Sequence, residues 1–336
     1  MVWTLPEPML TAPVPGSDLP PGHAAEPKWD GYRAQLARWS NGRILLRSRR
    51  GTDMTPAFPE IRASAAQLPD NTALDGELVV WDASGRLAFE RLNGRLTRRS
   101  PGAGRLASQW PAHFVAFDLL RLHNTDLTPW PYHRRRAALE ELFTGQKLSG
   151  ALALCPSTTD PDTARQWLDW TAAGLEGLVF KHLQAPYRPG TRGWSKYKVR
   201  ITTEAIVGAV TGTLAAPRTL LLGRYDDTGR LQYIGRTSTL SATTAANVTP
   251  HLSPVHGKHP WRGWTFSAGW GTHEKLDPIL VQPRPVAEVA VDVARDTAGR
   301  WRHPVKLQRI RTDLKPDDIP QFTGSASEAR RQAPTG

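Results

Sequence analysis

Stretches of alternating apolar and polar residues recur along the chain, and this period of two predicts strands with one buried face. The clearest pair is "YRAQLARWS" and "RILLRSRRG", which flank Asn41 and Gly42, a dipeptide that favours a tight hairpin turn. We expect two antiparallel strands there, with Lys28 at the mouth of the first. The run "TALDGELVVWDASGRLAF" predicts two strands joined by a turn at Ala83 to Gly85, and "HFVAFDLL" and "LEGLVFKH" predict single strands.

Helical segments are predicted between these strands, at "FPEIRASAAQL", at Tyr132 to Phe143 and at "DPDTARQWLDWTAAG". In the last of these, Asp160 would cap the start and Gly174 the end. The first 25 residues are rich in proline, so we expect an extended lead-in there rather than an element.

The pattern changes near Arg200, where short strands such as "EAIVGAVTGT" and "TLLLGRYDDTGRLQYIGRTST" are separated by turn signals. This spacing is typical of a small antiparallel barrel, with a hairpin at Asp227 to Arg230. We therefore place a boundary that divides residues 1–200 from residues 201–320. The small polar residues of 321–336 predict a disordered tail.

Composition is consistent with two folded domains. The chain has 336 residues, more than one comfortable core, with 39% hydrophobic residues and 13 Trp. Its 29 Pro and 28 Gly indicate many turns, which favours an α/β or β-rich architecture. A formal charge of +12 favours a polyanionic partner, most often nucleic acid, although a basic chain can also lack such a partner.

The single cysteine, Cys155, excludes an intrachain disulfide framework and a cysteine-based zinc site. No apolar run approaches the ~20 residues that cross a bilayer. The N-terminus "MVWTLPEPML" lacks the basic start and apolar core of a signal peptide. We therefore expect a cytoplasmic protein that binds no membrane.

Candidate chemistry depends on lysine, arginine and carboxylates, because the sequence contains no P-loop and no Rossmann fingerprint. Lys28, Asp30, Gly31 and Arg33 form a KxDGxR pattern that is rare by chance. It is followed in order by "SRRG" at 48–51, "LDGELVVWD" at 74–82, "EGLVFK" at 176–181 and "WSKYK" at 194–198.

This ordered set resembles the covalent nucleotidyltransferase superfamily, and most closely the bacterial ATP-dependent DNA ligases, including the compact ligase part of end-joining proteins. The strand "FVAFDLL" matches as well, and the resemblance covers about residues 20 to 315. It implies an α+β fold: an adenylation domain of antiparallel sheets with flanking helices (1–200), then an all-β OB-fold (201–320).

The resemblance makes Lys28 the nucleophile that attacks ATP and carries AMP. A lysine must be neutral to attack, and a free pKa near ~10.4 leaves less than about one part in a thousand neutral at pH 7. We expect burial and the nearby cations Lys196, Lys198 and Mg²⁺ to lower the pKa of Lys28. Without the other motifs, a solvated lysine at a strand edge would be the simpler interpretation.

The resemblance also assigns contacts to the nucleotide and to a metal ion, Mg²⁺ or Mn²⁺. Glu77 would bind the ribose and the metal, and Glu176 the metal, although strand glutamates are ordinarily solvated. The phosphate clamps would be Lys181, Lys196 and Lys198.

Around the base and ribose, Phe117 would stack on adenine and Val179 would lie on its other face, although both could simply be core residues. The backbone around Glu26 would read adenine N6. Arg33 and Arg49 would hold the ribose side and the 5′-phosphate of a nick, although Arg49 could belong to a plain basic surface.

The last motif, "RTDLKPDD", departs from the family pattern. Arg311 and Asp313 match the family's residues that orient pyrophosphate. Leu314 occupies the usual lysine position and Lys315 follows one residue later, so Lys315 is the weakest of these assignments.

The implied reaction seals a nick in double-stranded DNA in three steps: AMP is attached to Lys28, passes to a 5′-phosphate, and is displaced by a 3′-hydroxyl. We expect a monomer that works in DNA repair or end joining with a partner that delivers DNA ends. RNA ligases and GTP-using capping enzymes of the same superfamily remain alternatives, as does a non-catalytic OB-fold nucleic-acid binder.

Overall fold

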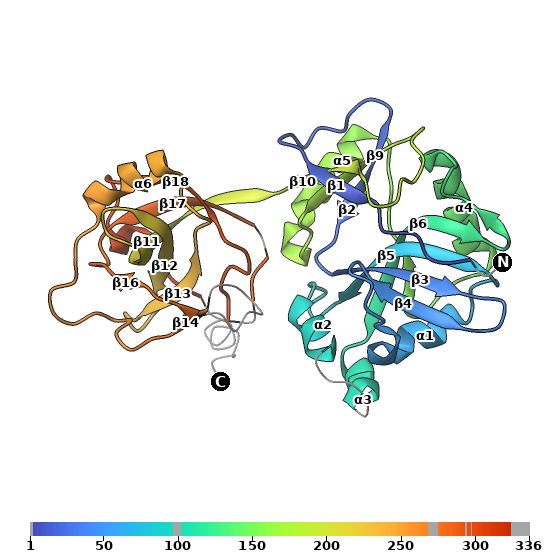
Figure 1. Cartoon of the computed structure of the whole chain (residues 1–336), viewed down its shortest axis with the longest axis horizontal. Coiled ribbons are helices and arrows are strands. Elements are labelled where there is room, and N and C mark those ends of the chain that lie inside the picture. Colours follow the sequence, from blue (N-terminus) through green and yellow to red (C-terminus); the bar gives the residue numbers. More distant parts are fainter. Residues whose placement is uncertain (1–2, 97–101, 268–274, 293, 297, 324–336) are drawn as a thin grey trace, which may run out of the picture. The chain divides into compact units, whose positions relative to one another are not determined.

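A computed structural model gives the structure of the chain and describes residues 3–96, 102–267, 275–292, 294–296 and 298–323. The chain divides into two compact units between Val199 and Arg200, each with its own sheets (Figure 1). Of the expected tail at 321–336, residues 324–336 lie outside the described part. No helix among the described residues is long and apolar enough to cross a bilayer.

The first unit is built on two sheets. One has the order β1-β10-β9-β2 and consists of β1 (Leu10–Pro13), β10 (Arg192–Lys198), β9 (Gly177–His182) and β2 (His23–Lys28). The other has the order β4-β3-β5-β6-β7 and consists of β4 (Ile44–Ser48), β3 (Tyr32–Arg38), β5 (Thr72–Val80), β6 (Ala112–Leu122) and β7 (Thr125–Asp126). A short strand, β8 (Leu152–Leu154), pairs with β6 in parallel.

Helices pack against both sheets, most of them against the second. The helices of the unit are α1 (Pro59–Ala65), α2 (Phe89–Leu96), α3 (Gly102–Gln109), α4 (Tyr132–Gly145) and α5 (Pro161–Trp167), with 3-10 turns at η1 (Thr55–Ala57) and η2 (Leu168–Ala173). In Figure 1, α1 and α4 pack near β6. The alternating strands bury the apolar side chains of one face. Leu36, Leu74 and Phe114 form a core with Ile61 and Leu139, and all five side chains are fully buried.

Several predicted elements are confirmed. The hairpin β3-β4 turns at Asn41 and Gly42, where Gly42 has a φ of 78°, a conformation that glycine adopts without steric cost. Asp160 caps α5 by accepting hydrogen bonds from the backbone N–H groups of Asp162 and Thr163. The first unit therefore has the expected mixture of antiparallel sheets and flanking helices.

Three expectations at this level are wrong. The proline-rich lead-in contains β1, which pairs in parallel with β10 and follows the buried Met9. Lys28 is the last residue of β2, in the four-stranded sheet, and does not begin the hairpin. The strand expected after Gly85 is reduced to a single bridge between Trp81 and Leu87, because α2 begins two residues later.

The turn between β2 and β3 joins the two sheets and depends on Gly31. A Cβ atom on this residue would lie 2.1 Å from the carbonyl oxygen of Leu78 in β5. Only glycine lets the backbone pass so close to β5. The motif therefore places Lys28 and Arg33 on different sheets, on either side of one turn.

The second unit is an antiparallel barrel-like sheet of order β13-β12-β11-β17-β18, with β16 also paired to β11. Its strands are β11 (Arg200–Gly212), β12 (Pro217–Tyr225), β13 (Leu231–Arg236), β16 (Ile279–Leu280), β17 (Val286–Asp292) and β18 (Lys306–Arg311). The remaining elements are β14 (Phe266–Ser267), β15 (Lys275–Leu276), α6 (Ala242–Val248), η3 (Thr249–His251) and η4 (Pro316–Asp318). The predicted hairpin at Asp227 to Arg230 is confirmed between β12 and β13.

Candidate active site

A cavity of about 1060 Å³ lies in the first unit, and strands of both sheets contribute to its wall. Nine of the residues singled out in the sequence line it: Glu26, Lys28, Arg33, Arg49, Glu77, Phe117, Val179, Lys181 and Lys196. These nine residues lie in six different strands and one loop, so the fold brings residues of separate sequence motifs together around one cavity.

Lys28 lies in this wall and its ammonium binds the carboxylate of Glu176. The Nζ atom of Lys198 lies 3.2 Å from the same Oε2 atom, so one buried carboxylate serves two cations. Backbone bonds hold this arrangement, since the N–H of Glu176 donates to the carbonyl of Lys28 (2.9 Å). Gly177 has a φ of 148°, and a Cβ atom added to it would lie 2.0 Å from the carbonyl oxygen of Tyr197. Only glycine therefore fits beside Glu176.

The expected lowering of the pKa of Lys28 is not what the structure shows. Burial does lower it, but the charge of Glu176, followed by those of Glu77 and Asp30, raises the pKa above its ordinary value. The cation whose pKa is lowered is Lys196, by burial and by Lys28. The sequence motifs could not show which sign dominates, because that depends on how close Glu176 comes to Lys28.

The two glutamates differ in their protonation. Burial raises the pKa of Glu77 to about 8, although Lys28 and Arg33 oppose the shift. Burial also acts on Glu176, but Lys28 and Lys198 outweigh it and lower its pKa to about 2. Glu176 is therefore a fixed negative charge, whereas Glu77 can take up a proton near neutral pH.

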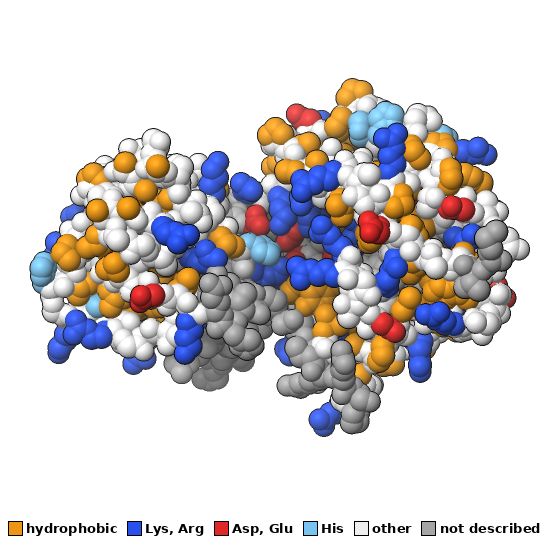
Figure 2. Space-filling view, viewed as in Figure 1, with side chains coloured by type: hydrophobic (Ala, Val, Ile, Leu, Met, Phe, Trp, Pro, Cys, Tyr) orange, Lys and Arg blue, Asp and Glu red, His pale blue; other side chains and the backbone are white. Residues whose placement is uncertain are grey.

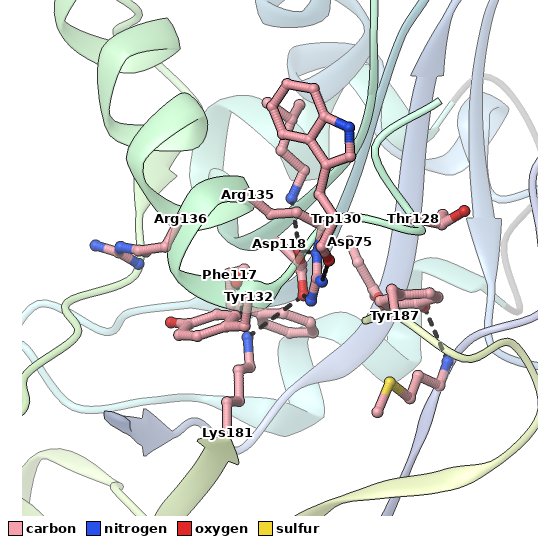
Figure 3. A network of polar contacts seen from close by, with 12 residues as sticks. Asp75, Phe117, Asp118, Thr128, Trp130, Tyr132, Arg135, Arg136, Lys181 and Tyr187 are labelled. Carbon is pink, nitrogen blue, oxygen red and sulfur yellow. Dashed lines mark hydrogen bonds and ion pairs between the residues drawn. The ribbon is translucent and has the colours of Figure 1, made fainter. Parts of the chain in front are cut away.

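Arg33 is tied to a buried carboxylate at the end of the cavity. Its Nε and Nη2 atoms donate to Asp75 at 3.1 and 2.7 Å, and its guanidinium lies 5.0 Å from the ring centroid of Trp194. Tyr187 donates to Asp75 at 2.6 Å and accepts a hydrogen bond from the N–H of Met9 at 2.8 Å (Figure 3). Arg33 is thereby fixed to β5 and, through Tyr187, to the segment that leads into β1.

Another part of the wall is aromatic and contains a buried ion pair. Phe117 meets the ring of Trp194 edge-on at 5.8 Å, and Val179 lines the same cavity. The Nζ atom of Lys181 lies 2.8 Å from Oε2 of Glu26 and 2.7 Å from the carbonyl oxygen of Phe117. Figure 3 shows Lys181 pointing at Phe117 and Tyr132.

Lys181 is deeply buried, and the phosphate-clamp role expected for it stays a prediction. Its side chain is 1% exposed and its ammonium is neutralised by Glu26, a different carboxylate from the one that binds Lys28 and Lys198. Two of the lysines expected to act together, Lys181 and Lys198, therefore pair with different carboxylates.

Residues of α4 support this ion pair and were not identified in the sequence. The hydroxyl of Tyr132 donates to Oε1 of Glu26 at 2.5 Å, and Nη1 of Arg136 lies 4.0 Å from the same atom. Arg135 forms a fully buried pair with Asp118, with its Nε atom 2.8 Å from Oδ1. A signal was present: the helical period places Tyr132, Arg135 and Arg136 on the face that also buries Leu139.

The final motif lies in the second unit. Arg311 binds Asp313 through Nε (2.8 Å) and Nη2 (2.6 Å), and its Nη1 atom lies 3.2 Å from Glu288. Leu314 packs against the cluster around Trp261, which explains an apolar residue where the family has lysine. Lys315 is exposed.

Comparisons with known proteins agree with this geometry. The family model described as ATP dependent DNA ligase domain matches residues 8–198, and the one described as ATP dependent DNA ligase C terminal region matches residues 215–314. DNA ligase C2 of Mycolicibacterium smegmatis is 34% identical over 91% of this chain and 90% of its own length. DNA ligase C of Mycobacterium tuberculosis is 33% identical over 92% of this chain and 90% of its own length.

Longer relatives and solved structures extend the comparison. The multifunctional non-homologous end joining DNA repair protein LigD of Mycobacterium tuberculosis is 33% identical over 88% of this chain, which spans 37% of that protein. The structure described as mycobacterial DNA ligase D complexed with ATP and MES is 30% identical, with a TM-score of 0.51 over 94% of this chain and 98% of that chain. The matches confirm the predicted adenylation and OB-fold architecture, and the chain belongs to the ATP-dependent DNA ligase family.

Proposed function

We propose that this ligase seals nicks between a 5′-phosphate and a 3′-hydroxyl in double-stranded DNA, with AMP carried on Lys28. The observation that carries the proposal is the position of Lys28 in the wall of a cavity that also contains Phe117, Val179 and Lys196. A lysine amine next to a nucleotide-sized cavity and further cations is suited to attack the α-phosphate of ATP. The attack forms an N–P bond and releases pyrophosphate.

We assign the aromatic part of the cavity to the base. Phe117 and Val179 offer two apolar surfaces for a purine ring. Glu26 accepts hydrogen bonds and Lys181 donates them, which complements the N6 amino group and the N1 acceptor of adenine. We propose this role for Lys181 in place of a phosphate clamp.

We assign the cationic part to the phosphates. Lys196 lines the cavity, and Lys198 contacts Glu176. Arg49 also lines the cavity, and its side chain is exposed to solvent. Positive charge here would offset the charge that develops as pyrophosphate leaves. Lys28 becomes a nucleophile only when its bond to Glu176 is weakened, because that contact favours the ammonium form.

The carboxylates of Glu77 and Glu176 fit a divalent cation. Magnesium is commonly held by one or two carboxylates together with substrate phosphates and water. Mg²⁺ or Mn²⁺ bound there would supply positive charge to the triphosphate. A cation nearby would also favour the ionised form of Glu77.

We infer that the second unit grips duplex DNA through its phosphates and that Arg311 and Asp313 act on pyrophosphate, with Lys315 as a further contact. The whole chain carries a formal charge of +12, which suits phosphate binding, and Lys and Arg side chains are widespread on the face shown in Figure 2. The relative named for non-homologous end joining supports work in DNA repair. We further propose that the chain works in the cytoplasm as a monomer, with a partner that delivers DNA ends.

Covalent labelling with radioactive ATP tests the proposal. We expect the purified chain to acquire a label from ATP, and Lys28→Ala to abolish it, because no other amine occupies this position. Lys147→Ala, at an exposed lysine, is a matched control that should label normally.

A second measurement separates the substrate classes. The labelled enzyme should seal a nicked DNA duplex, and comparison with a 3′-ribonucleotide end would define the preferred strand. Labelling by GTP instead of ATP, or nick sealing by Lys28→Ala, would contradict the proposal.

A further inference from the structure

The carboxylate of Glu26 is held from several sides although it lies in the wall of the cavity. It is 2% exposed, and its two oxygens have separate partners. Oε1 accepts from the hydroxyl of Tyr132 at 2.5 Å and lies 4.0 Å from Nη1 of Arg136. Oε2 lies 2.8 Å from Nζ of Lys181. Two of these three partners come from α4, which is outside every motif of the sequence.

The direction of the hydrogen bond from Tyr132 is fixed by its partners. The phenol donates to Oε1 of Glu26. The hydroxyl of Ser157, 3.1 Å from the phenolic oxygen, then has to donate to Tyr132. Burial and the charge of Glu26 raise the pKa of Tyr132 well above its ordinary value, which keeps this proton in place.

Hydrogen bonds also fix the position of the Arg136 side chain. Its Nε atom donates to Glu140 at 2.6 Å, and Nη1 donates to the carbonyl oxygen of Cys155 at 2.7 Å. The guanidinium therefore remains beside Glu26 as a fixed positive charge. Its attraction for Oε1 opposes rotation of the Glu26 carboxylate away from α4.

An oriented carboxylate beside an ammonium distinguishes purines by their hydrogen-bonding groups. Adenine presents an amino donor at C6 and an acceptor at N1, which match Glu26 and Lys181. Guanine presents an acceptor at C6 and a donor at N1, which is the reverse order. A carboxyl group that rotated or took up a proton would lose this discrimination, because it could then donate as well as accept.

We propose that Tyr132 and Arg136 are positioning residues that set the preference for a 6-aminopurine nucleotide by holding the Glu26 carboxylate in one orientation. The proposal rests on the proposed function, since it concerns the nucleotide that Lys28 attacks. Neither residue acts on the reacting phosphate; both act through Glu26.

The test compares three nucleotides in the full-length chain: ATP, GTP and purine riboside triphosphate, which lacks the 6-amino group. The rate of covalent labelling per nucleotide concentration is measured for the wild type, Tyr132→Phe and Arg136→Gln. We expect the preference for ATP over purine riboside triphosphate to fall by about tenfold in both variants, because ATP loses a contact that the analogue never makes. The relative labelling by GTP should rise.

The ratio between two nucleotides is measured within one protein sample, so a loss of folded protein does not change it. Arg134→Gln, at an exposed arginine of the same helix, is the matched control and should keep the wild-type ratio. Unchanged ratios in both test variants would overturn the inference while leaving the proposed function intact. Failure of the wild type to take a label from any nucleotide would instead contradict the proposed function.

Discussion

At the scale of single residues, the cavity is governed by which carboxylate each cation meets. Glu176 binds Lys28 and Lys198, Glu26 binds Lys181, and Glu77 forms no ion pair within the part of the chain that the structure describes. The first pairing keeps the proposed nucleophile charged, the second fixes the part proposed to bind the base, and Glu77 remains available for a proton or a cation. These three states lead to different dependences on pH.

The labelling of Lys28 should depend strongly on pH. Because Glu176 raises the pKa of Lys28, the neutral amine becomes about tenfold more abundant for each pH unit between about pH 6 and 8, and the rate should follow. In Glu176→Gln the carboxylate is gone and burial dominates, so the profile should level off at lower pH even if the maximal rate falls. Single-turnover labelling across this range measures both profiles, and identical profiles would contradict the assignment.

Glu77 should weaken the fold as pH rises. Its folded-state pKa of about 8 lies above the ordinary value of 4.5, so the contribution of the bound proton to stability is fully present below about pH 4.5 and is lost as pH rises from about 4.5 through 8. In metal-free buffer, Glu77→Gln should be more stable than the wild type at pH 8 by on the order of a few kcal/mol, and similar to it at about pH 4. Urea unfolding at the two pH values measures the difference, and equal stability at pH 8 would refute the shift.

At the scale of elements, the sequence predicts features that depend on neighbouring residues but does not predict the pairing of strands that are far apart in the chain. Asn41 with Gly42 and Asp160 act within a few residues, so the hairpin and the helix cap could be inferred from the sequence. The strand β1 could not, because its partner β10 lies about 180 residues further along and its own sequence is rich in proline.

The same distinction applies to the cavity. The family motifs identified most of its lining, including Lys28, Glu77 and Phe117. They did not reveal Tyr132 and Arg136, whose contacts with Glu26 span more than 100 residues and depend on where α4 packs. The sign of the pKa shift at Lys28 was missed for the same reason, since it is set by a distance and not by residue type.

The turn between β2 and β3 gives a prediction at this scale. Gly31→Ala would place a Cβ atom 2.1 Å from the carbonyl oxygen of Leu78, so the two sheets must separate locally. We expect a loss of about 3 kcal/mol in the free energy of unfolding and weaker labelling of Lys28. Gly16→Ala is the control, because nothing lies within 4 Å of its added Cβ atom. Chemical denaturation compares the two, and equal stability would show that the turn tolerates a side chain.

At the scale of the whole molecule, charge is the dominant property. A formal charge of +12 on 336 residues means that binding to DNA should release counterions from several phosphates. We expect the logarithm of the DNA affinity to fall linearly with the logarithm of the salt concentration, with a slope of about −4 to −6. Fluorescence anisotropy with a nicked duplex measures the slope. ATP labelling without DNA should change far less with salt, and a slope near zero would argue against binding through phosphates.

The pairing of β1 with β10 also constrains how the chain folds during synthesis. The four-stranded sheet takes its outer strands, β1 and β2, from residues 10–28 and its inner strands, β9 and β10, from residues 177–198. During translation, β1 and β2 therefore lack their partner strands until almost the whole unit has been synthesised. The β3-β5-β6 sheet can form sooner because its strands are nearer to one another in sequence. The wall that carries Lys28 is therefore the last part of the unit to close, so a nascent chain acquires a nucleotide-binding cavity only near the end of the unit's translation.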